Sequence, residues 1–327
     1  MKTALQGSFP KIPAGPGPSV RSAINRFERG QIGPRELDAT FRQVTERVLR
    51  LAEEHRIDRT TDGQIRWNDL FDPLVRDVDN VSAEGLLRLY DNNFYYRHPV
   101  IRGYVQFQGG TLAEWTRQAL RMTRLPLKVA LPGPFTFLDL SEDLTYHRRE
   151  RLLADWIEIL QLEVESLAEL GVAEIQWDEP SLTRGQFTVS EVVEGMTQLK
   201  QGISAPVAQS LALYWGPSAN WLEPMASLGW DAIYLDFVAD PGLWKVAQST
   251  RLPFVLGVGA IDARDARLEE PTQLAQQLEP VLARQGQERV ILCPTSGLEL
   301  LPPDRAIAKV ECLAKTRDLV TGRSPVQ

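Results

Sequence analysis

Two adjacent carboxylates, Asp178 and Glu179, are followed by Pro180 and form the most distinctive polar group of the chain. They close the run 171–176, and we expect residues 173–178 to be a buried strand. Successive side chains of a strand point to opposite sides, so one carboxylate can face a pocket while the other anchors a loop. We assign the catalytic and substrate-binding role to Asp178 and expect Glu179 to brace the turn before Pro180. A purely structural turn is the alternative.

Strand-like runs that could position these carboxylates alternate with longer amphipathic stretches, in about eight βα units typical of a parallel sheet. The strand candidates are 3–8, 57–61, 100–107, 127–131, 173–178, 207–214, 232–237, 254–261 and 290–294. The helix candidates are 34–55, 112–122, 147–170, 189–200, 218–227, 272–283 and 303–316. Many strand candidates are rich in Val, Ile and Leu, as strands buried on both faces should be. The sheet could be closed or doubly wound, but no Gly-x-Gly-x-x-Gly motif opens a helix after a strand.

We therefore predict an α/β fold, a single (β/α)8 TIM barrel over residues 1–327. Nine strand candidates exceed eight by one, so we expect one of them to be a hairpin or a loop piece. Residues 62–98 form a long irregular excursion that is rich in aromatic residues. Such density in a long connection favours a lid or wall over a pocket, and a packed surface excursion is the alternative.

Composition excludes several functional classes. The chain has 327 residues, 43% of them hydrophobic, and a formal net charge of −7. This acidic balance argues against nucleic acid or an anionic membrane as a partner. The sequence contains no run of eighteen apolar residues that would predict a membrane span. Two cysteines are too few for a disulfide scaffold, and the first residues lack the apolar region of a signal peptide. We expect a cytoplasmic protein with a small-molecule substrate.

Four polar or glycine-rich motifs follow the predicted strands in a characteristic order. They are Gly7-Ser8-Phe9-Pro10, Asp62-Gly63-Gln64 with Asn68-Asp69, Leu131-Pro132-Gly133-Pro134 and Gln176-Trp177-Asp178-Glu179-Pro180. In these motifs the chain resembles the C-terminal catalytic barrel of cobalamin-independent methionine synthase, over nearly its whole length. The same superfamily includes corrinoid-linked methyltransferases and uroporphyrinogen decarboxylase. The large N-terminal half of the full-length synthase has no counterpart here, so the chain resembles the short single-barrel version.

The resemblance implies methyl transfer to a thiol, from a methylated folate or from a methylated corrinoid protein. In the family a zinc ion bound by His, Cys, Glu and Cys activates the thiol. A thiol with a pKa near about 8.5 is mostly protonated at neutral pH, and zinc removes the proton.

The four positions that match the family's zinc ligands depart from this pattern. They fall at Leu211, Leu213, Asp236 and Ser296. A tetrahedral site cannot be assembled from Asp236 and Ser296 alone, so we expect no zinc there. Recruitment of Cys293 into a relocated site is the alternative. The chain's histidines lie away from the expected strand ends, at His55, His98 and His147.

Other site residues follow from the resemblance. Asp262 matches the family's proton-donating histidine, and capping of the next turn is its alternative role. Gln64 replaces a carboxylate that holds the substrate's ammonium group, which turns an ion pair into a neutral hydrogen bond. The candidate catalytic residues are Asp178, Asp262 and Asp236. The candidate substrate-binding residues are Ser8, Gln64, Asn68, Asp178, Glu179, Tyr214 and Ser296.

Aromatic residues near the predicted ends of two strands suggest where a donor would bind. Trp177 and Trp215 could stack on a flat pterin ring, and core packing is the alternative for Trp177. We expect Tyr214 and Trp215 to fill the space that a metal would occupy, since an empty cavity is costly.

The function that we predict is a divergent methyltransferase whose acceptor need not be homocysteine. The donor would be a methylated folate or another methyl carrier, including a corrinoid protein. An acceptor that attacks through carbon or nitrogen needs no zinc, because a carboxylate can remove its proton. Two alternatives stay open: a lyase or decarboxylase on the same barrel, or a catalytically silent relative that binds a folate-like ligand or a partner protein.

Overall fold

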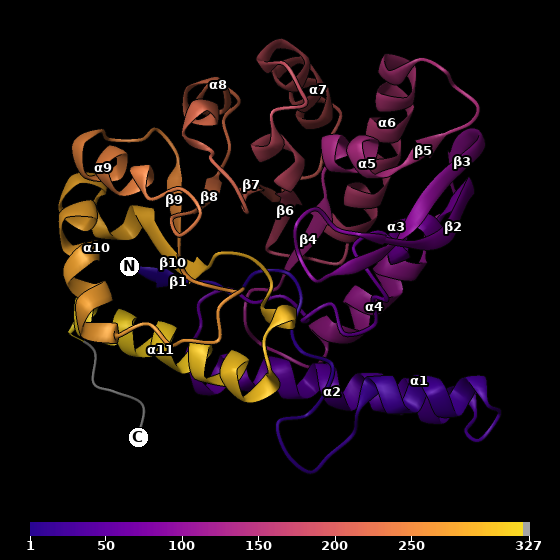
Figure 1. Ribbon diagram of the computed structural model, residues 1–327, viewed down its shortest axis with the longest axis horizontal. Helices are drawn as coiled ribbons and strands as arrows, with labels where there is room; N and C mark the ends of the chain where they lie inside the picture. The colour runs from indigo at the N-terminus through magenta and orange to yellow at the C-terminus, as the bar shows by residue number, and fades with distance from the viewer. Residues whose placement is uncertain (323–327) are drawn as a thin grey trace. The chain divides into compact units, whose positions relative to one another are not determined.

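The computed structural model describes residues 1–322, which fall into two compact units (Figure 1). Unit 1 comprises Met1–Arg66, Ala119–Lys128 and the segment that begins at Tyr234. Unit 2 comprises Trp67–Gln118 and Val129–Ile233. Because the segments interleave along the chain, no single linker separates the units.

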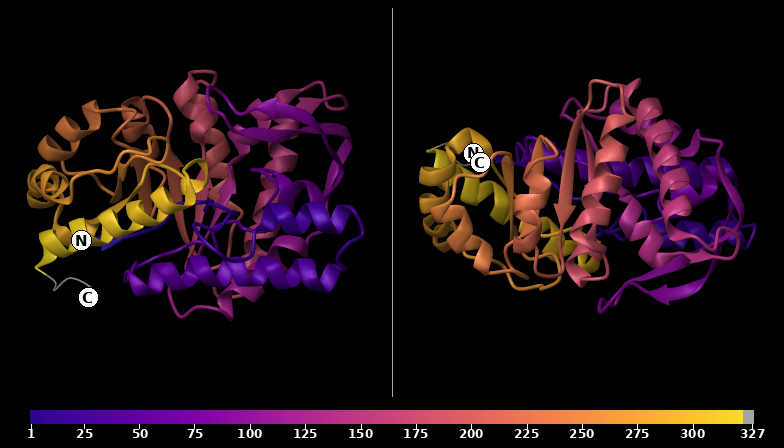
Figure 2. Two further views of the ribbon diagram at one scale, coloured as in Figure 1. Left: turned by 60° about the horizontal axis from the view of Figure 1, so that its bottom comes forward. Right: turned by 90° about the horizontal axis from the view of Figure 1, so that it is seen from above.

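Unit 1 contains the parallel strands β1 (Lys2–Thr3), β10 (Val290–Pro294) and β9 (Val255–Ile261), in this order, with β8 (Ala232–Asp236) next to β9. β8 begins in unit 2 and ends in unit 1. The helices of unit 1 are α1 (Val20–Glu28), α2 (Pro34–Glu54), α9 (Gly242–Ser249), α10 (Pro271–Gln285) and α11 (Pro303–Thr321). The last of these, α11, packs against β1, β10 and α10 (Figure 2).

Unit 2 contains β7 (Ala208–Leu213), β6 (Glu174–Asp178) and β4 (Lys128–Pro132), of which β6 and β7 pair in parallel. Its longer helices are α4 (Thr111–Leu120), α6 (Arg149–Ala168) and α7 (Val189–Gln201). Its shorter helices are α3 (Asp72–Arg76), α5 (Pro134–Leu140) and α8 (Leu222–Ala226). β4, β6, β8 and β10 are buried along their whole length. These strands confirm the α/β class and are buried on both faces, including the polar residues Glu174, Gln176 and Asp178 of β6.

The candidate strand 100–107 is the surplus one. It belongs to β3 (Tyr95–Phe107), which forms an antiparallel hairpin with β2 (Val78–Arg88) and adds the short β5 (Glu142–Asp143) on its other side. The prediction of an irregular excursion over 62–98 was wrong in this part. Bulges flank Asn80 and Gly85, which both have positive φ, so the sequence of β2 loses the two-residue alternation that identifies a strand.

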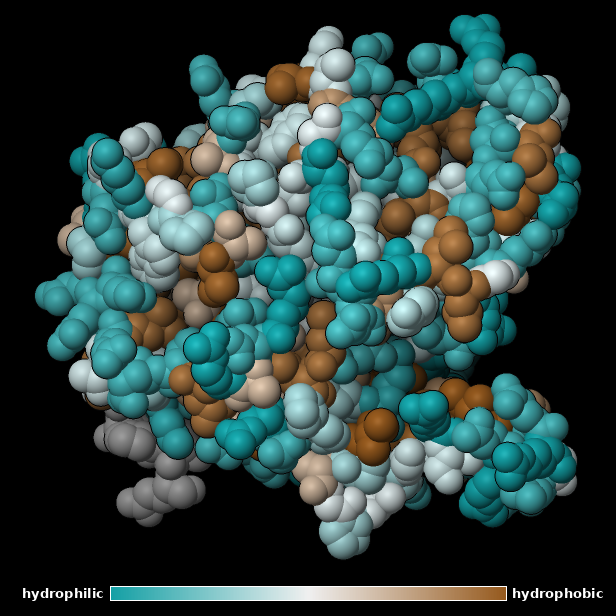
Figure 3. Space-filling model, viewed as in Figure 1, coloured by the Kyte–Doolittle hydropathy of each residue, from teal (hydrophilic) through white to brown (hydrophobic). Residues whose placement is uncertain are grey.

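The candidate strand 57–61 is represented by two isolated parallel bridges rather than by a ladder. One bridge joins Ala4 to Arg59 and the other joins Thr60 to Leu127, all within unit 1. Among residues 1–322, no helix is long and apolar enough to cross a membrane. The face in Figure 3 is largely hydrophilic with scattered apolar side chains, as the surfaces of folded proteins generally are.

Candidate functional site

Asp178 is the last residue of β6 and belongs to a hydrogen-bonded group in unit 2. Its side chain is almost fully buried, and its Oδ1 accepts a hydrogen bond of 2.7 Å from Gln176 Nε2. The hydroxyl of Tyr214, the residue after β7, also bonds to this carboxylate. Burial and the charge of Asp178 raise the pKa of Tyr214 well above its usual value, so Tyr214 remains a donor. Gln176 and Tyr214 thereby fix the orientation of the Asp178 carboxylate at the end of β6.

Glu179 has a different environment, although it is the next residue. It is fully buried and accepts hydrogen bonds from the backbone N–H groups of Phe135 (2.9 Å) and Thr136 (2.7 Å). The hydroxyls of Thr136 and Ser181 bond to the same carboxylate. Burial outweighs these bonds and raises the pKa of Glu179 to about 7. Glu179 therefore braces the start of α5, where a negative charge is favoured by the free N–H groups of the helix.

The tryptophans differ in exposure. Trp177 is fully buried and its Nε1 lies 3.4 Å from Gln209 Oε1, which favours the core-packing alternative over a stacking surface. Trp215 is half-buried and packs edge-on against Tyr214, with ring centroids 4.8 Å apart. The backbone of Trp215 has a φ of 70°. A non-glycine residue pays about 1 kcal/mol for this left-handed conformation, and such strain is often found at ligand-binding sites.

The turn of the β2–β3 hairpin is fastened near the end of β6, within unit 2. Tyr90 donates a hydrogen bond of 2.7 Å to Asp139 Oδ2. Arg184 bonds to Asp91 at 3.0 Å, and its guanidinium carbon lies 4.9 Å from the centre of the Tyr90 ring. Burial, Asp139 and, more weakly, Glu179 raise the pKa of Tyr90. The hairpin turn thus lies near Tyr214, which bonds to Asp178. Its aromatic density gave the only sequence signal, and the partners Asp139 and Arg184 were missed.

A second group lies in unit 1, after β1 and β10. The backbone N–H of Leu298 donates to the carbonyl oxygen of Ser8 at 2.8 Å. A side chain at Gly297 would bring its Cβ within 2.4 Å of Ser8 Oγ, so only glycine fits there. A Cβ at Gly7 would lie 3.7 Å from Gln64 Oε1. Ser8 and Gln64 are therefore brought together beside the loop that contains Ser296.

Asp62 belongs to the same loop region and was missed as a site candidate. Its Oδ1 accepts a hydrogen bond of 2.8 Å from the backbone N–H of Gln64. Burial raises the pKa of Asp62, and the charges of Arg66 and Lys11 partly oppose this. The Asp-Gly dipeptide in the second motif was the available signal, but it also predicts an ordinary turn.

The other acidic candidates of unit 1 accept hydrogen bonds from backbone N–H groups of the loops in which they lie. Asp236 ends β8, and its Oδ1 accepts hydrogen bonds from the backbone N–H groups of Val238 (3.0 Å) and Ala239 (2.8 Å). Asp262 follows β9, is half-buried, and accepts a hydrogen bond of 2.8 Å from Arg264 N–H through Oδ1. Asp262 therefore caps the turn that follows it, which was the alternative to a role in proton transfer. Its Oδ2 accepts no hydrogen bond from the described residues, so it remains available for a proton.

Asn68 lies on the exposed surface of unit 2. It bonds to both oxygens of Asp72 at the start of α3, at 3.0 Å through its side chain and 3.2 Å through its backbone. Its observed role is therefore to tie the preceding loop to the first residue of α3. The neighbouring Asp69 is the buried carboxylate of this motif and accepts backbone hydrogen bonds from Phe71 and Arg97.

The residues that the resemblance places at the family's zinc positions do not fit a zinc ion. Leu211 and Leu213 are buried hydrocarbon side chains, and zinc in proteins takes nitrogen, sulfur or oxygen ligands. One oxygen of Asp236 already holds two backbone groups. Cys293 is fully buried within β10. Over residues 1–322, no three His, Cys, Asp or Glu side chains gather in a metal-binding group.

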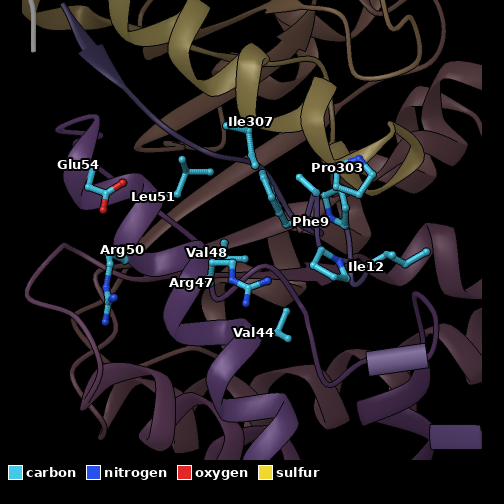
Figure 4. Close-up of a pocket in the computed structure, with 13 residues that line it drawn as sticks. Phe9, Ile12, Val44, Arg47, Val48, Arg50, Leu51, Glu54, Pro303 and Ile307 are labelled. Atoms are coloured by element: carbon cyan, nitrogen blue, oxygen red, sulfur yellow. The ribbon is translucent and has the colours of Figure 1, made fainter. Parts of the chain in front are cut away.

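A cavity of about 140 Å³ in unit 1 lies behind the Gly7-Ser8-Phe9-Pro10 loop (Figure 4). Its apolar wall includes Phe9, Val48, Leu51 and Ile307, from the loop, α2 and α11. None of the candidate site residues lines it. The cavity therefore does not bring the polar candidates together, and Phe9 contributes to the wall of the cavity beside Ser8.

Comparison with known proteins identifies similar chains. The model of the catalytic domain of cobalamin-independent synthase matches residues 1–317. A methionine synthase of Sulfolobus acidocaldarius is 24% identical over 317 residues, which cover 96% of this chain and 91% of that protein. A B12-independent methionine synthase from a Shewanella species, solved with selenomethionine, has a TM-score of 0.80 at 20% identity and covers 98% of this chain and 97% of its own. A methyltransferase from Methanosarcina mazei has a TM-score of 0.60 at 13% identity, covering 94% and 93%.

Proposed function

This chain belongs to the cobalamin-independent synthase catalytic-domain family, and from that premise we propose that it transfers a methyl group to a small-molecule acceptor other than a zinc-activated thiol. The family supports methyl transfer in general. The single observation that carries the finer proposal is the pair of buried leucines, Leu211 and Leu213, at two positions that the resemblance assigns to zinc ligands, while Asp178 on the neighbouring strand is bonded to Gln176 and Tyr214.

Asp178 would bind the acceptor through an ammonium or other N–H group. Gln176 and Tyr214 hold its carboxylate in one orientation at the end of β6. Ser8 and Gln64 of unit 1 are the neutral residues that the resemblance assigns to substrate binding. Gln64 is neutral, so it binds an ammonium group less strongly than a carboxylate would. This favours an acceptor different from homocysteine.

Asp262 is the carboxylate that we propose for proton transfer. A nitrogen or carbon acceptor loses a proton as it takes the methyl group, and Asp262 would accept that proton through Oδ2. Asp236 suits this role less well, because its Oδ1 is engaged by two backbone N–H groups and the side chain is almost fully buried. Glu179 is excluded by its hydrogen bonds to α5.

The donor would be a methylated folate or a methylated corrinoid protein. Trp215, which is half-buried beside Tyr214, is the aromatic residue that supports a flat donor ring. A folate donor leaves as an amine and needs a proton, whereas a corrinoid donor does not. The two donors can therefore be distinguished by the pH dependence of transfer.

The finer fold assignment, one closed (β/α)8 barrel, is likewise our proposal. Two observations in unit 1 support it: residues 59–60 form a parallel bridge with Ala4 on one side and with Leu127 on the other. A short eighth strand at this position would join β1 to the start of β4. Solution of the structure by crystallography would test the closure directly.

The test of function uses the purified chain with methyl-labelled methyltetrahydrofolate or methylcobalamin, and with either homocysteine or a panel of small amines. We expect label to reach an amine or carbon acceptor at a rate that a chelator does not change. Transfer to homocysteine that requires added zinc would overturn the proposal. Asp178→Asn is the matched negative control, because it keeps the shape of the group and removes its charge.

A further inference from the structure

A buried lysine on α11 connects to the backbone of Asp262 through one shared carboxylate. Lys309 Nζ lies 2.7 Å from Glu269 Oε1. The same oxygen accepts a hydrogen bond of 2.9 Å from the backbone N–H of Asp262. All three residues lie in unit 1, and Lys309 is fully buried. The contacts form an unbroken path from α11 to the first residue after β9.

The loop that this path holds is fixed at two further points. The backbone N–H of Ala263 donates to Thr295 Oγ1 at 3.0 Å, which ties the loop to the end of β10. Cys312 Sγ, one turn along α11 from Lys309, lies 3.3 Å from the carbonyl oxygen of Glu269. Glu269 is therefore held through its side chain and through its backbone, and the start of the loop has little freedom to move.

Stability alone does not account for this arrangement. Burying an ammonium and a carboxylate costs solvation free energy that their attraction roughly repays, and apolar residues of similar size are often as stable. The ion pair of Lys309 and Glu269 does hold both side chains in one arrangement, because the buried ammonium group has no alternative partner among the described residues. The geometry fixed here is that of Asp262, the residue that we assign to proton transfer.

We propose that Lys309 is a positioning residue for the reaction: through Glu269 it orients Asp262 so that its free carboxylate oxygen can take the acceptor's proton. This inference rests on the proposed function, because it gives Lys309 a role only if Asp262 acts. Arg264 N–H holds Oδ1 while Glu269 holds the backbone N–H, so Oδ2 is the atom left for chemistry. Asp265 and Arg267, which pair with each other on the same loop, are the nearby charges that stay unchanged in the test.

The test compares Lys309→Met with Lys315→Met. Methionine keeps the length of lysine and removes the charge. Lys315 is a matched control on the same helix, since its side chain is exposed and its pairing with Glu311 at 3.5 Å is a surface contact. We expect Lys309→Met to lower kcat for methyl transfer about tenfold with KM unchanged, and Lys315→Met to leave both unchanged. Glu269→Gln serves as a second variant should Lys309→Met fail to fold.

A double-mutant cycle separates positioning from general stability. In an Asp262→Ala background, Lys309→Met should cause no further loss of kcat, because the residue that it positions is gone. Equal fold losses in both backgrounds would overturn the inference and leave Lys309 structural.

Amide hydrogen exchange supplies a readout that does not need activity. Exchange of the Asp262 N–H should become faster in Lys309→Met and stay slow in Lys315→Met. Unchanged exchange in Lys309→Met would sink the inference even in an active enzyme. A wild-type chain that transfers no methyl group to any acceptor, but shows the faster exchange in the variant, would instead count against the proposed function.

Discussion

Asp178 and Glu179 are neighbours in the chain, but they have different partners. Asp178 bonds to two side chains, Gln176 and Tyr214, whereas Glu179 bonds to the backbone and hydroxyl groups at the start of α5. Because a strand directs successive side chains to opposite sides, one residue can serve the site and the other the fold. Changes at the two positions should therefore affect different measurements.

We predict that Asp178→Asn removes substrate binding while Glu179→Gln lowers stability. A lost ion pair with a bound ammonium costs about 2–4 kcal/mol, or roughly 30- to 1000-fold in affinity or turnover. Glu179→Gln replaces one acceptor oxygen by an NH2 group, which leaves buried donors at the start of α5 unpaired and should cost about 1–3 kcal/mol of unfolding free energy. Melting temperature and methyl transfer are to be measured on both variants. An unfolded Asp178→Asn with intact binding would show that the two roles are reversed.

A second residue-scale prediction concerns Glu163, a buried carboxylate on α6. Both of its oxygens are buried and lack a hydrogen-bond partner in the described residues. Burial, and secondarily the charge of Asp77, raise the pKa of Glu163 from 4.5 to about 8. Because the folded-state pKa is the higher one, its contribution to stability is complete below about pH 4.5 and is lost as the pH rises through about 8.

Glu163→Gln should therefore stabilise the protein at pH 8 relative to wild type, by about 1–3 kcal/mol, and by less at pH 5. Glu158→Gln, an exposed position on the same helix, should leave the difference between the two pH values unchanged. Urea unfolding at both pH values measures this. A constant difference between Glu163→Gln and wild type across pH would show that Glu163 is not protonated in the folded protein.

At the scale of elements, the start of α5 is held by a contact that joins two of the sequence motifs. A Cβ at Gly133 would lie 2.2 Å from Glu179 Oε1. The φ of Gly133 is −74°, which any residue can adopt, so the need for glycine is one of space alone. The glycine lets the chain approach closely enough for Glu179 to reach Phe135 and Thr136.

Gly133→Ala should consequently destabilise the protein by about 1–3 kcal/mol, as overpacking of a buried contact generally does. Gly15→Ala is the control, since a Cβ at Gly15 meets no atom within 4 Å. The test is to measure the melting temperatures of both variants and of wild type by thermal unfolding. Equal melting temperatures for Gly133→Ala and wild type would mean that Glu179 can withdraw from α5 without cost.

The elements that the sequence predicted best are those whose pattern depends on burial alone. β4, β6, β8 and β10 are buried along their whole length and were all expected close to their observed ends, although β6 contains Glu174, Gln176 and Asp178. The strand β2 was missed because its bulges interrupt the alternation of its residues. Contacts between distant segments, such as Glu179 with α5 or Lys309 with Glu269, leave no local pattern in the sequence. Only the chain's folding brings these partners together.

At the scale of the whole molecule, metal binding is decided by several strands at once. In the family that the chain resembles, the zinc ligands come from the ends of different strands, so no local change restores the site. The resemblance assigns these zinc-ligand positions to Leu211, Leu213, Asp236 and Ser296 of this chain. Without zinc, a thiol acceptor would stay mostly protonated at neutral pH.

We therefore predict that the purified chain carries no stoichiometric zinc and that chelation does not change its melting temperature. A bound structural ion would add binding free energy to folding, so its removal would lower the melting temperature measurably. Elemental analysis and thermal unfolding with and without a chelator test this on wild type and on Cys293→Ser. About one zinc per chain, lost in Cys293→Ser, would show that Cys293 has been recruited into a relocated site. Methyl transfer to a thiol would then again be the expected chemistry, because the ion that makes the thiolate would be present.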